Sequence, residues 1–333
     1  MDNKNSVLLD GFGRKHDYLR ISLTERCNLR CFYCMPEEGI ALRDKTHFMS
    51  TEELLYIAKT FVQFGVKKIR LTGGEPLLKK DFLSIIEGLA TMPIEIAITS
   101  NGVLIDQYIE DFKRLGIKKL NISLDSLNEE KFNRISRRTY FQKIMENIRL
   151  LIKENFDLKV NVVLIKGIND DEIIDFIQWT QNEKVKIRFI EFMPFDGNKW
   201  DFSKQISFKE IIDKTSQFFG KENVVPLEII ANETSKNFKI VGSKGDFGII
   251  SSITNPFCDT CNRIRLTADG KLKNCLFSGE ETDLLSSLRK GMDINSLIIQ
   301  NIQNKKKQRA NVFDENNLIS KEYKNRSMVT IGG

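Results

Sequence analysis

The first two thirds of the chain alternate short apolar stretches with longer stretches whose apolar residues recur at helical spacing. The short stretches, rich in Ile, Val and Leu, predict six β-strands at residues 19–23, 68–71, 94–98, 119–124, 158–164 and 186–189. The longer ones predict helices at 51–64, 81–89, 105–115, 129–135, 140–155 and 171–181. Ser50 and Glu53 form a capping-box signature at the first of these helices. Regular alternation of strand and helix favours right-handed βαβ units, and therefore a parallel sheet.

The number of units predicts an open barrel rather than a closed one. A closed barrel of eight units typically needs about 250 residues, and the alternation ends near residue 189. We therefore expect an α/β fold with an incomplete (βα)6 TIM-like barrel over residues 1–219. Beyond it, two hairpins are predicted, with turns at 242–245 and 268–270, and two helices at 282–288 and 294–302. These elements predict an α+β extension over 220–333 that closes the open side of the barrel.

Composition excludes several classes of protein. Of the 333 residues, 41% are apolar and 29% are charged, and the net charge is only +6, so disordered, collagen-like and coiled-coil proteins do not fit. No apolar run approaches the roughly 18 residues of a membrane helix, and the first ten residues lack the apolar block of a signal peptide. We expect a soluble, cytoplasmic protein with no membrane and no nucleic-acid partner. The basic run at 305–309 is interpreted as a solvated helix end rather than a nucleic-acid patch.

Six cysteines form two triplets at opposite ends of the chain. They are Cys27, Cys31 and Cys34, and then Cys258, Cys261 and Cys275. The first triplet follows the first predicted strand, which places it on the face where barrels carry their active sites. Thiolates select zinc or iron–sulfur clusters, and three of them would leave one iron of a 4Fe–4S cluster open. Zinc is the alternative at both triplets, and unrelated buried cysteines are a further one at the first.

Several cations are expected to face the interior. Arg263 and Arg265 lie two apart in a predicted strand and so share a face. Lys159 and Arg188 lie in strands that a parallel sheet buries on both sides, and Arg70 precedes a glycine-rich turn. Unpaired buried charges are costly, so for the set we favour an anionic ligand, a polyphosphate, over surface positions or salt bridges. The Lys159 assignment depends on register, because a shift of one residue would turn it outward.

The first triplet resembles the signature of the radical S-adenosylmethionine (SAM) superfamily, with the spacing Cys27-x3-Cys31-x2-Cys34 and an aromatic residue before the last cysteine. The turn Gly73-Gly-Glu-Pro76 resembles the motif with which that superfamily binds the methionyl amino group, although alone it could be an ordinary tight turn. The resemblance implies a 4Fe–4S cluster whose open iron chelates SAM, and reductive cleavage of SAM to a 5′-deoxyadenosyl radical. It also implies SAM contacts from Tyr33, Gly74, Ser123 and Met193. Without the resemblance, Met193 would be interpreted as core.

The second triplet narrows the resemblance to one family. The run Cys258-Asp-Thr-Cys261-Asn-Arg-Ile-Arg265, with Cys275 and the terminal Ile331-Gly-Gly333, closely resembles the MoaA family of GTP 3′,8-cyclases of molybdenum cofactor biosynthesis. That resemblance covers nearly the whole chain. It implies a second 4Fe–4S cluster whose open iron binds guanine, removal of the C3′ hydrogen of GTP by the deoxyadenosyl radical, and the product (8S)-3′,8-cyclo-7,8-dihydroguanosine 5′-triphosphate. The GTP contacts it implies are Arg20, Arg70, Thr99, Lys159, Arg263 and Arg265, with Arg188 as a weaker candidate.

The same resemblance implies a mobile tail and several partners. Gly332 and Gly333 would form a tail that reaches the active site, whereas a frayed terminus is the ordinary expectation. The partners would be an external one-electron reductant and, by product transfer, cyclic pyranopterin monophosphate synthase, and a homodimer stays open. Two alternatives remain: a radical SAM enzyme that modifies a peptide or RNA, which usually has spare cysteines that this chain lacks, and a non-catalytic iron–sulfur or zinc module, which would need neither the Gly-Gly-Glu-Pro turn nor converging cations.

Overall fold

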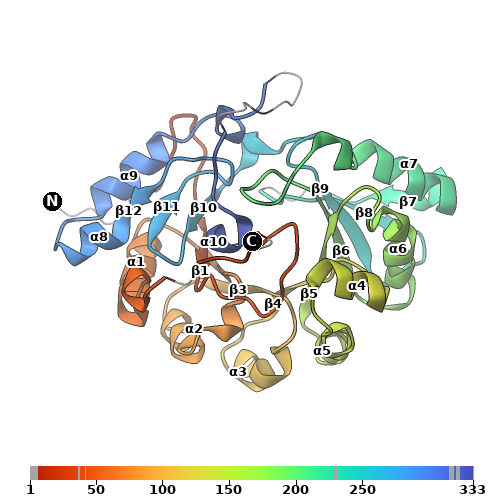
Figure 1. Ribbon diagram of the computed structural model, residues 1–333, viewed down its shortest axis with the longest axis horizontal. Helices are drawn as coiled ribbons and strands as arrows, with labels where there is room; N and C mark the ends of the chain where they lie inside the picture. Colours follow the sequence, from red (N-terminus) through yellow and green to blue (C-terminus); the bar gives the residue numbers. More distant parts are fainter. Residues whose placement is uncertain are drawn as a thin grey trace.

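Six parallel strands in sequential order form the wall of a partial barrel (Figure 1). The computed structural model describes residues 7–36, 38–41, 43–228, 232–314, 319 and 323–332. The barrel strands are β1 (Tyr18–Ser22), β2 (Lys68–Thr72), β3 (Glu95–Ser100), β4 (Lys119–Ser123), β5 (Asp157–Leu164) and β6 (Lys186–Glu191). Each pairs in parallel with the next, as the alternation in the sequence predicted.

Helices cover the outer side of this wall (Figure 1). They are α1 (Thr51–Gln63), α2 (Phe82–Ala90), α3 (Ile109–Arg114), α4 (Glu129–Ser136), α5 (Phe141–Lys153) and α6 (Ile173–Asn182). The predicted capping box at α1 is present: the Ser50 hydroxyl accepts from the Glu53 amide, and the Glu53 carboxylate accepts from the Ser50 amide. A short 3-10 turn, Ile105–Tyr108, precedes α3, so the helix predicted at 105–115 is divided in two.

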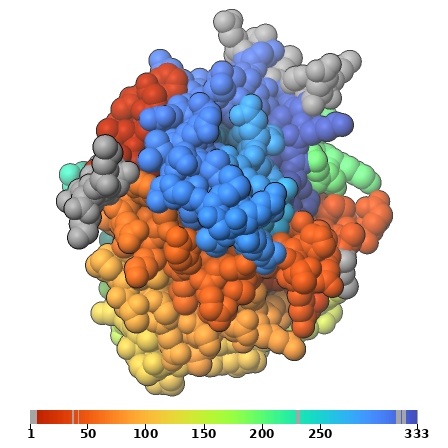
Figure 2. Space-filling model, turned by 90° about the vertical axis from the view of Figure 1, so that its left-hand side faces the viewer, coloured from red at the N-terminus to blue at the C-terminus, as the bar shows by residue number. Residues whose placement is uncertain are grey.

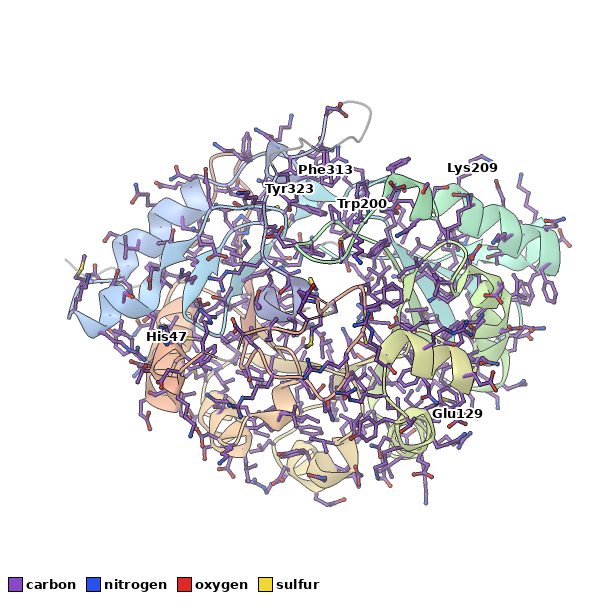
Figure 3. All side chains as sticks on the ribbon, viewed as in Figure 1. His47, Glu129, Trp200, Lys209, Phe313 and Tyr323 are labelled. Carbon is purple, nitrogen blue, oxygen red and sulfur yellow. The ribbon has the colours of Figure 1, made fainter. Side chains whose placement is uncertain are left out.

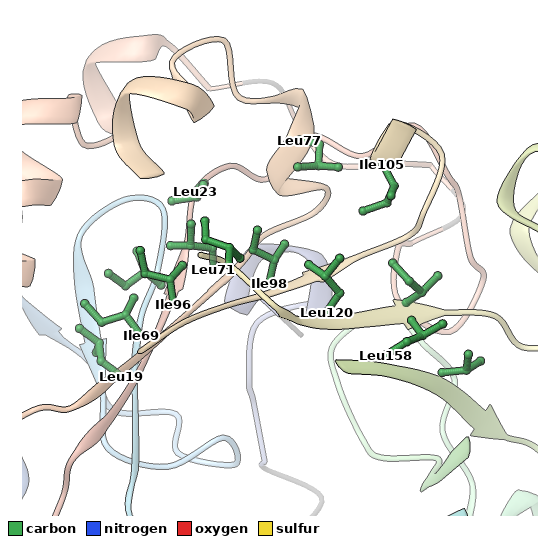
Figure 4. Packing of buried hydrophobic residues seen from close by; sticks show 14 of the residues in the cluster. Leu19, Leu23, Ile69, Leu71, Leu77, Ile96, Ile98, Ile105, Leu120 and Leu158 are labelled. Atoms are coloured by element: carbon green, nitrogen blue, oxygen red, sulfur yellow. The ribbon is translucent and has the colours of Figure 1, made fainter. Parts of the chain in front are cut away.

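The apolar core lies between the strands and these helices. Figure 4 shows side chains such as Leu19, Ile69 and Ile98 packed on the helix side of the wall. Along β5, every second residue is buried, while Lys159, Asn161 and Val163 between them are partly exposed on the inner side. The outer face therefore stabilises the fold through apolar burial, and the inner face carries polar groups.

The C-terminal extension adds strands to both edges of the wall. Next to β6 lie β9 (Asp246–Ile250), β8 (Lys236–Ile240) and β7 (Val224–Pro226), and next to β1 lie β10 (Arg263–Leu266), β11 (Lys271–Lys273) and β12 (Thr282–Asp283). The β8–β9 and β10–β11 pairs are the two predicted hairpins, and β9 and β10 are parallel to β6 and β1. The described residues thus form one twelve-stranded sheet. The expected incomplete barrel with a C-terminal extension over its open side is confirmed.

The remaining helices pack around this extension. They are α7 (Phe208–Phe219), α8 (Leu284–Arg289), α9 (Asn295–Gln303) and α10 (Met328–Ile331). Figure 2 shows the blue C-terminal segment packed over the orange segment near the N-terminus, where Arg289 of α8 donates to Glu53 of α1 over 2.6 Å. None of the helices in the described ranges is long and apolar enough to cross a membrane.

Two further local features differ from the sequence analysis. The sequence patterns missed α7, although Ser207 and Glu210 form a capping box at its start. The helix predicted at 282–288 begins only at Leu284, because Thr282–Asp283 pairs with β11 and the Asp283 carboxylate then caps the helix. The boundary between 1–219 and 220–333 stays a prediction: α7 ends at Phe219, but the sheet continues across it.

Candidate active site

A cavity of about 290 Å³ lies inside the barrel, toward the C-terminal ends of its strands. Every barrel strand contributes to its lining, and so do β9 and β10 of the extension. All six cysteines line it, as do Tyr33, Gly74, Ser123, Met193, Arg20, Thr99, Arg188, Arg263 and Arg265. Two triplets separated by more than 200 residues in sequence therefore share this cavity, which we call the chamber. Of the residues singled out from the sequence, Arg70 and Lys159 do not line it.

The loop with the first triplet is held against the glycine-rich turn. The amides of Gly74 and Glu75 donate to the carbonyls of Thr24 and Arg26, each over 2.7 Å. A β-carbon added at Gly74 would lie 2.4 Å from the Arg26 carbonyl oxygen, so a side chain at this position would force the two loops apart. The glycine is therefore required by the close approach of the two backbones that form this wall of the cavity.

The Glu75 side chain fixes the other end of the turn. Its buried carboxylate accepts from the Asn101 amide (2.7 Å), the Leu77 amide (3.1 Å) and the Ser100 hydroxyl (2.9 Å). Burial raises the pKa of Glu75 to about 7 despite these donors. The Asn101 side chain lies 3.7 Å from the Cys27 sulfur, so Asn101 is a neighbour of the first triplet that the sequence patterns did not reveal.

The surroundings of the first triplet disfavour negative charge on its thiols. Burial and the nearby Glu75 carboxylate raise the pKa of Cys27 to about 11, and burial with Asp125 raises that of Cys31. Tyr33 donates to Asp125 over 2.5 Å, and burial raises the pKa of this carboxyl to about 6. These thiols therefore lose their protons readily only when a metal centre replaces the protons.

In the second triplet, Cys261 has the opposite electrostatics, although burial raises the pKa of Cys258. Cys258 begins a 3-10 turn (Cys258–Thr260) that Cys261 follows just before β10, and Cys275 follows β11 on the other arm of the hairpin. Burial opposes ionisation of Cys261, but Arg263 and Lys305 outweigh it and lower its pKa to about 6. The Lys305 ammonium lies 3.4 Å from the Cys261 sulfur. Lys305 is buried, so the interpretation of residues 305–309 as a solvated helix end is wrong at this position.

The two cysteine triplets fit iron–sulfur clusters better than single metal ions. Among the described residues, no three cysteine, histidine or acidic side chains lie close enough together to hold a single metal ion. In a 4Fe–4S cluster each thiolate binds a different iron, so its ligands stand further apart than those of one zinc ion. Each triplet faces the cavity, and within each triplet the thiols are near enough to affect one another's pKa. The arrangement suits two clusters, each with three thiolates.

Positive charge gathers between the triplets. Register places Arg20 beside both Arg265 and Arg70 on neighbouring strands. Burial, with Arg20 and Arg263 nearby, lowers the pKa of Arg265. The Nε atom of Arg20 is buried and has no hydrogen-bond partner. A buried donor without a partner is costly, and an acceptor atom of a ligand would satisfy it.

The protein groups that contact the arginines of the chamber are mainly uncharged. Arg188 donates from Nε and Nη2 to the Asn161 side-chain oxygen (3.0 and 2.8 Å), and burial with Arg70 lowers its pKa to about 9. Arg70 lies below the cavity wall and donates to the Tyr18 hydroxyl (2.6 Å) and to the Thr99 hydroxyl (3.3 Å). Burial alone would raise the pKa of Tyr18, but Arg70 and other cations lower it to about 7. The chamber therefore holds an excess of positive charge.

Lys159 faces inward, as its predicted register requires. It lies on the same side of β5 as Asn161, which lines the cavity. Its ammonium is 3.7 Å from Glu233, at the end of the barrel away from the cysteines. Burial and the nearby Arg188 lower its pKa to about 8. Lys159 thus adds to the positive field of the interior without forming part of the cavity wall.

The last described residues of the C-terminal segment contact the wall of this chamber. Figure 1 shows α10 near the centre of the barrel, and the Gly332 carbonyl accepts from Arg265 over 2.7 Å. We call residues 323–332 the strap. Figure 3 shows Tyr323 and Phe313 on one rim, where both contact Phe277 of the cavity lining. Gly333, the other residue of the expected tail, lies outside the described residues.

Fold and site together define a radical SAM protein. Residues 21–180 match the model of the Radical SAM superfamily, and residues 185–311 match that of Molybdenum Cofactor Synthesis C. Two solved structures share the fold alone, each with a TM-score of 0.60. Streptococcus suis SuiB is 13% identical over 86% of this chain and 67% of its own, and anSMEcpe with bound AdoMet is 16% identical over 87% and 81%.

Curated relatives narrow the class. GTP 3′,8-cyclase of Peptoclostridium acidaminophilum is 43% identical over the whole of both chains. The mitochondrial GTP 3′,8-cyclase of Arabidopsis thaliana is 43% identical over 99% of this chain and 84% of its own. The chain belongs to the GTP 3′,8-cyclase family of radical SAM enzymes. Human molybdenum cofactor biosynthesis protein 1 is 44% identical over 98% of this chain, which spans only 51% of the human protein. Family membership gives SAM and two 4Fe–4S clusters as the cofactors.

Proposed function

We propose that this protein is a GTP 3′,8-cyclase of molybdenum cofactor biosynthesis. The observation that carries the proposal is the shared chamber, in which two cysteine triplets face each other across arginines whose positive charge the protein leaves largely unbalanced. A triphosphate would supply acceptors for these guanidinium groups, including the buried Arg20 Nε. The 43% identity with the bacterial cyclase over its entire length supports the same substrate.

The proposed ligand sets follow the two sides of the chamber. Cys27, Cys31 and Cys34 would hold the cluster that binds SAM, and the SAM molecule itself would contact Tyr33, Gly74, Ser123 and Met193. Cys258, Cys261 and Cys275 would hold the cluster that faces guanine. The residues assigned to GTP are Arg20, Arg70, Thr99, Lys159, Arg263 and Arg265, with Arg188 beside them. All of these except Arg70 and Lys159 line the cavity.

Arg70 and Lys159 lie behind the cavity wall, but both support the assignment of GTP as the substrate. Arg70 donates to the Thr99 hydroxyl, which lines the cavity, and so can hold that hydroxyl in place for a phosphate. Lys159 lies near enough to Arg188 for each to contribute to one positive field. A polyanion entering the chamber would interact favourably with both, because charges separated by a few ångströms interact strongly in a poorly solvated interior.

The chain's own residues would orient the reactants and keep out water. When bound, SAM and its cluster supply the 5′-deoxyadenosyl radical that takes the C3′ hydrogen of GTP, on the way to (8S)-3′,8-cyclo-7,8-dihydroguanosine 5′-triphosphate. The arginines would fix the triphosphate, and thereby the ribose, between the two triplets. The strap would cover the chamber, since Met328 lines it and Gly332 contacts Arg265.

The proposed activity implies partners and a compartment. We infer an external one-electron reductant and transfer of the product to cyclic pyranopterin monophosphate synthase. We also infer a cytoplasmic location, because the six cysteines are free and cluster ligands persist in a reducing compartment. A homodimer is compatible with these functions, and light scattering during size-exclusion chromatography would distinguish it from a monomer. Cell fractionation followed by immunoblotting would test the compartment.

Anaerobic reconstitution tests the proposal. We expect about eight irons per chain, as two 4Fe–4S clusters require. Incubation with SAM, dithionite and one nucleoside triphosphate at a time should give 5′-deoxyadenosine at a much higher rate with GTP than with ATP, CTP or UTP. Equal rates with all four nucleotides would refute the cyclase assignment. About four irons plus one zinc would refute the second cluster.

A substitution separates binding from cluster assembly. Arg265→Ala should weaken GTP binding about 10- to 100-fold, the loss expected for one charge-assisted hydrogen bond, while iron stays at about eight per chain. Arg134→Ala removes an exposed arginine from α4 and should change neither quantity. Loss of iron from the Arg265 variant would show that this side chain supports the fold rather than the substrate.

A further inference from the structure

Lys305 differs from the two lysines that follow it. Only 4% of its surface is exposed, whereas Lys306 and Lys307 are exposed. Its ammonium donates to the Arg263 carbonyl over 3.0 Å and lies 3.4 Å from the Cys261 sulfur. A buried ammonium is costly unless an anion lies beside it. Of these two partners, only the sulfur can carry negative charge, and it does so as a cluster ligand.

The N-terminal segment holds Lys305 in this position. Arg14 donates to the carbonyls of Lys306 (2.9 Å), Lys307 (2.7 Å) and Cys258 (2.9 Å). The buried Asp10 carboxylate in turn accepts from Arg14 over 2.6 Å. One guanidinium therefore ties the segment after α9 to the loop that carries the second triplet. Lys305 is placed by a built contact between distant parts of the chain, which makes an accidental approach to Cys261 a poor explanation.

The first triplet has one nearby cation, Arg30, but burial and the Glu75 carboxylate outweigh it, and the pKa of Cys27 is raised to about 11. The other close neighbours of this triplet are the Asp125 carboxylate and the neutral amide of Asn101. Hydrogen bonds and positive charge at cluster sulfurs stabilise the reduced cluster, which carries one more negative charge, and so raise the reduction potential. The asymmetry between the triplets therefore bears on the electron-transfer properties of the second cluster in particular.

We propose that Lys305 is a positioning residue that acts on the second cluster through the Cys261 sulfur and would raise the reduction potential of that cluster. The inference rests on the proposed assignment of the second triplet to a cluster, but not on the identity of the substrate. Lys305 acts through Cys261 and has no contact with the reacting atoms. The electron that reduces the cluster comes from an external reductant, which is dithionite in the experiment below.

The test uses a full-length chain in which Cys27, Cys31 and Cys34 are replaced by Ala, so that only the second cluster assembles. In this background, Lys305→Met keeps the volume of the side chain and removes its charge, Lys305→Arg restores the charge, and Lys306→Met is the matched surface control. Each protein is reconstituted anaerobically, its iron is counted, and its cluster is titrated with dithionite while the reduced form is followed by electron paramagnetic resonance.

We expect about four irons per chain in the background protein and in all three variants. At any fixed potential, Lys305→Met should lower the ratio of reduced to oxidised cluster about tenfold, a shift of about 59 mV to more negative potential for one electron. The Lys305→Arg and Lys306→Met variants should titrate as the background protein does. Equal potentials in the Met and Arg variants at position 305 would overturn the inference.

Two further outcomes are also decisive. If Lys305→Met fails to retain iron, Lys305→Gln, which keeps a donor without the charge, is compared with Lys305→Arg: a more negative potential in the Gln variant supports the inference, and equal potentials overturn it. Absence of iron from the background protein would contradict the proposed ligand set of the second triplet, and this inference with it. The failure of the inference and the failure of the proposed function therefore give different results.

Discussion

The strap is anchored at Arg326, and we predict that Asp269→Asn loosens this anchor. Asp269 lies at the tip of the β10–β11 hairpin and accepts two hydrogen bonds from Arg326, each of 2.9 Å. Arg43, from the loop after the first triplet, donates to the same carboxylate over 3.1 Å. Only 4% of the Asp269 side chain is exposed. One carboxylate thus joins the strap to both halves of the chamber.

The pKa of Asp269 sets the size of the effect. Burial alone would raise it, but Arg326, Thr267 and Arg43 lower it from 3.8 to about 2. Because the folded value lies below the unfolded one, the stabilisation is complete above pH 3.8 and is lost as the pH falls through 2; at neutral pH it amounts to about 2.5 kcal/mol. Arg326 keeps a second partner in Glu281, so we expect asparagine to cost about 2 kcal/mol, which is roughly 30-fold in the opening of the strap.

Hydrogen exchange measures this opening directly. The strap amides include those of Asn325, which donates to Asp196 over 3.0 Å, and Gly332, which donates to the Met328 carbonyl over 3.0 Å. In the Asp269 variant, mass spectrometry should show these amides exchanging roughly 30-fold faster, with α5 unchanged. Glu110→Gln removes one charge of an exposed ion pair and should leave the strap as it is. Acceleration below about threefold, or equal acceleration in α5, would refute the reasoning.

Three other predictions each follow from a single residue. Burial and Lys305 lower the pKa of His16 from 6.5 to about 4. As the pH falls, the unfolded chain is protonated before the folded one, so the free energy of unfolding should fall by about 3 kcal/mol between pH 6.5 and 4. His16→Gln should flatten this slope in denaturant titrations. Ala310 has φ 55, and Ala310→Gly should stabilise the chain by up to about 1 kcal/mol, measured by thermal unfolding. Glu75→Gln deprives one buried donor of its acceptor, so calorimetry should show SAM binding weakened about tenfold at unchanged iron content.

Local patterns predicted most of the fold because its elements have simple periodicities. The six strands and the helices between them were placed by apolar runs and helical spacing, and both hairpins by glycine-containing turns. Even α7 had a visible signal in Ser207 and Glu210, which are spaced as a capping box. The pairing of β10 with β1 had no visible signal in the sequence. It joins Arg265 to Arg20 across most of the chain, and local sequence does not encode such a contact.

The candidate site likewise has features that local sequence predicted and features that depend on contacts between distant residues. The spacing of the cysteines is local and was sufficient to indicate two ligand sets. Whether a cation lines the chamber depends on its level along the tilted strands, which explains why Arg188 lies in the wall while Lys159, on the neighbouring strand, lies beyond it. The burial of Lys305 depends on Arg14, nearly three hundred residues away, so the basic run alone gave the wrong interpretation.

The division between the two faces of the barrel explains how such a chamber can exist in a stable protein. Register brings Arg265, Arg20 and Arg70 to matching positions on three adjacent strands, which lie about 5 Å apart. Like charges at that spacing oppose closure of the wall. The outer faces of the same strands carry Leu19, Ile69 and their neighbours, fully buried against the helices, and that apolar contact offsets the repulsion. The fold is therefore stabilised from outside, and the inner face can keep an excess of positive charge that an anionic ligand would neutralise.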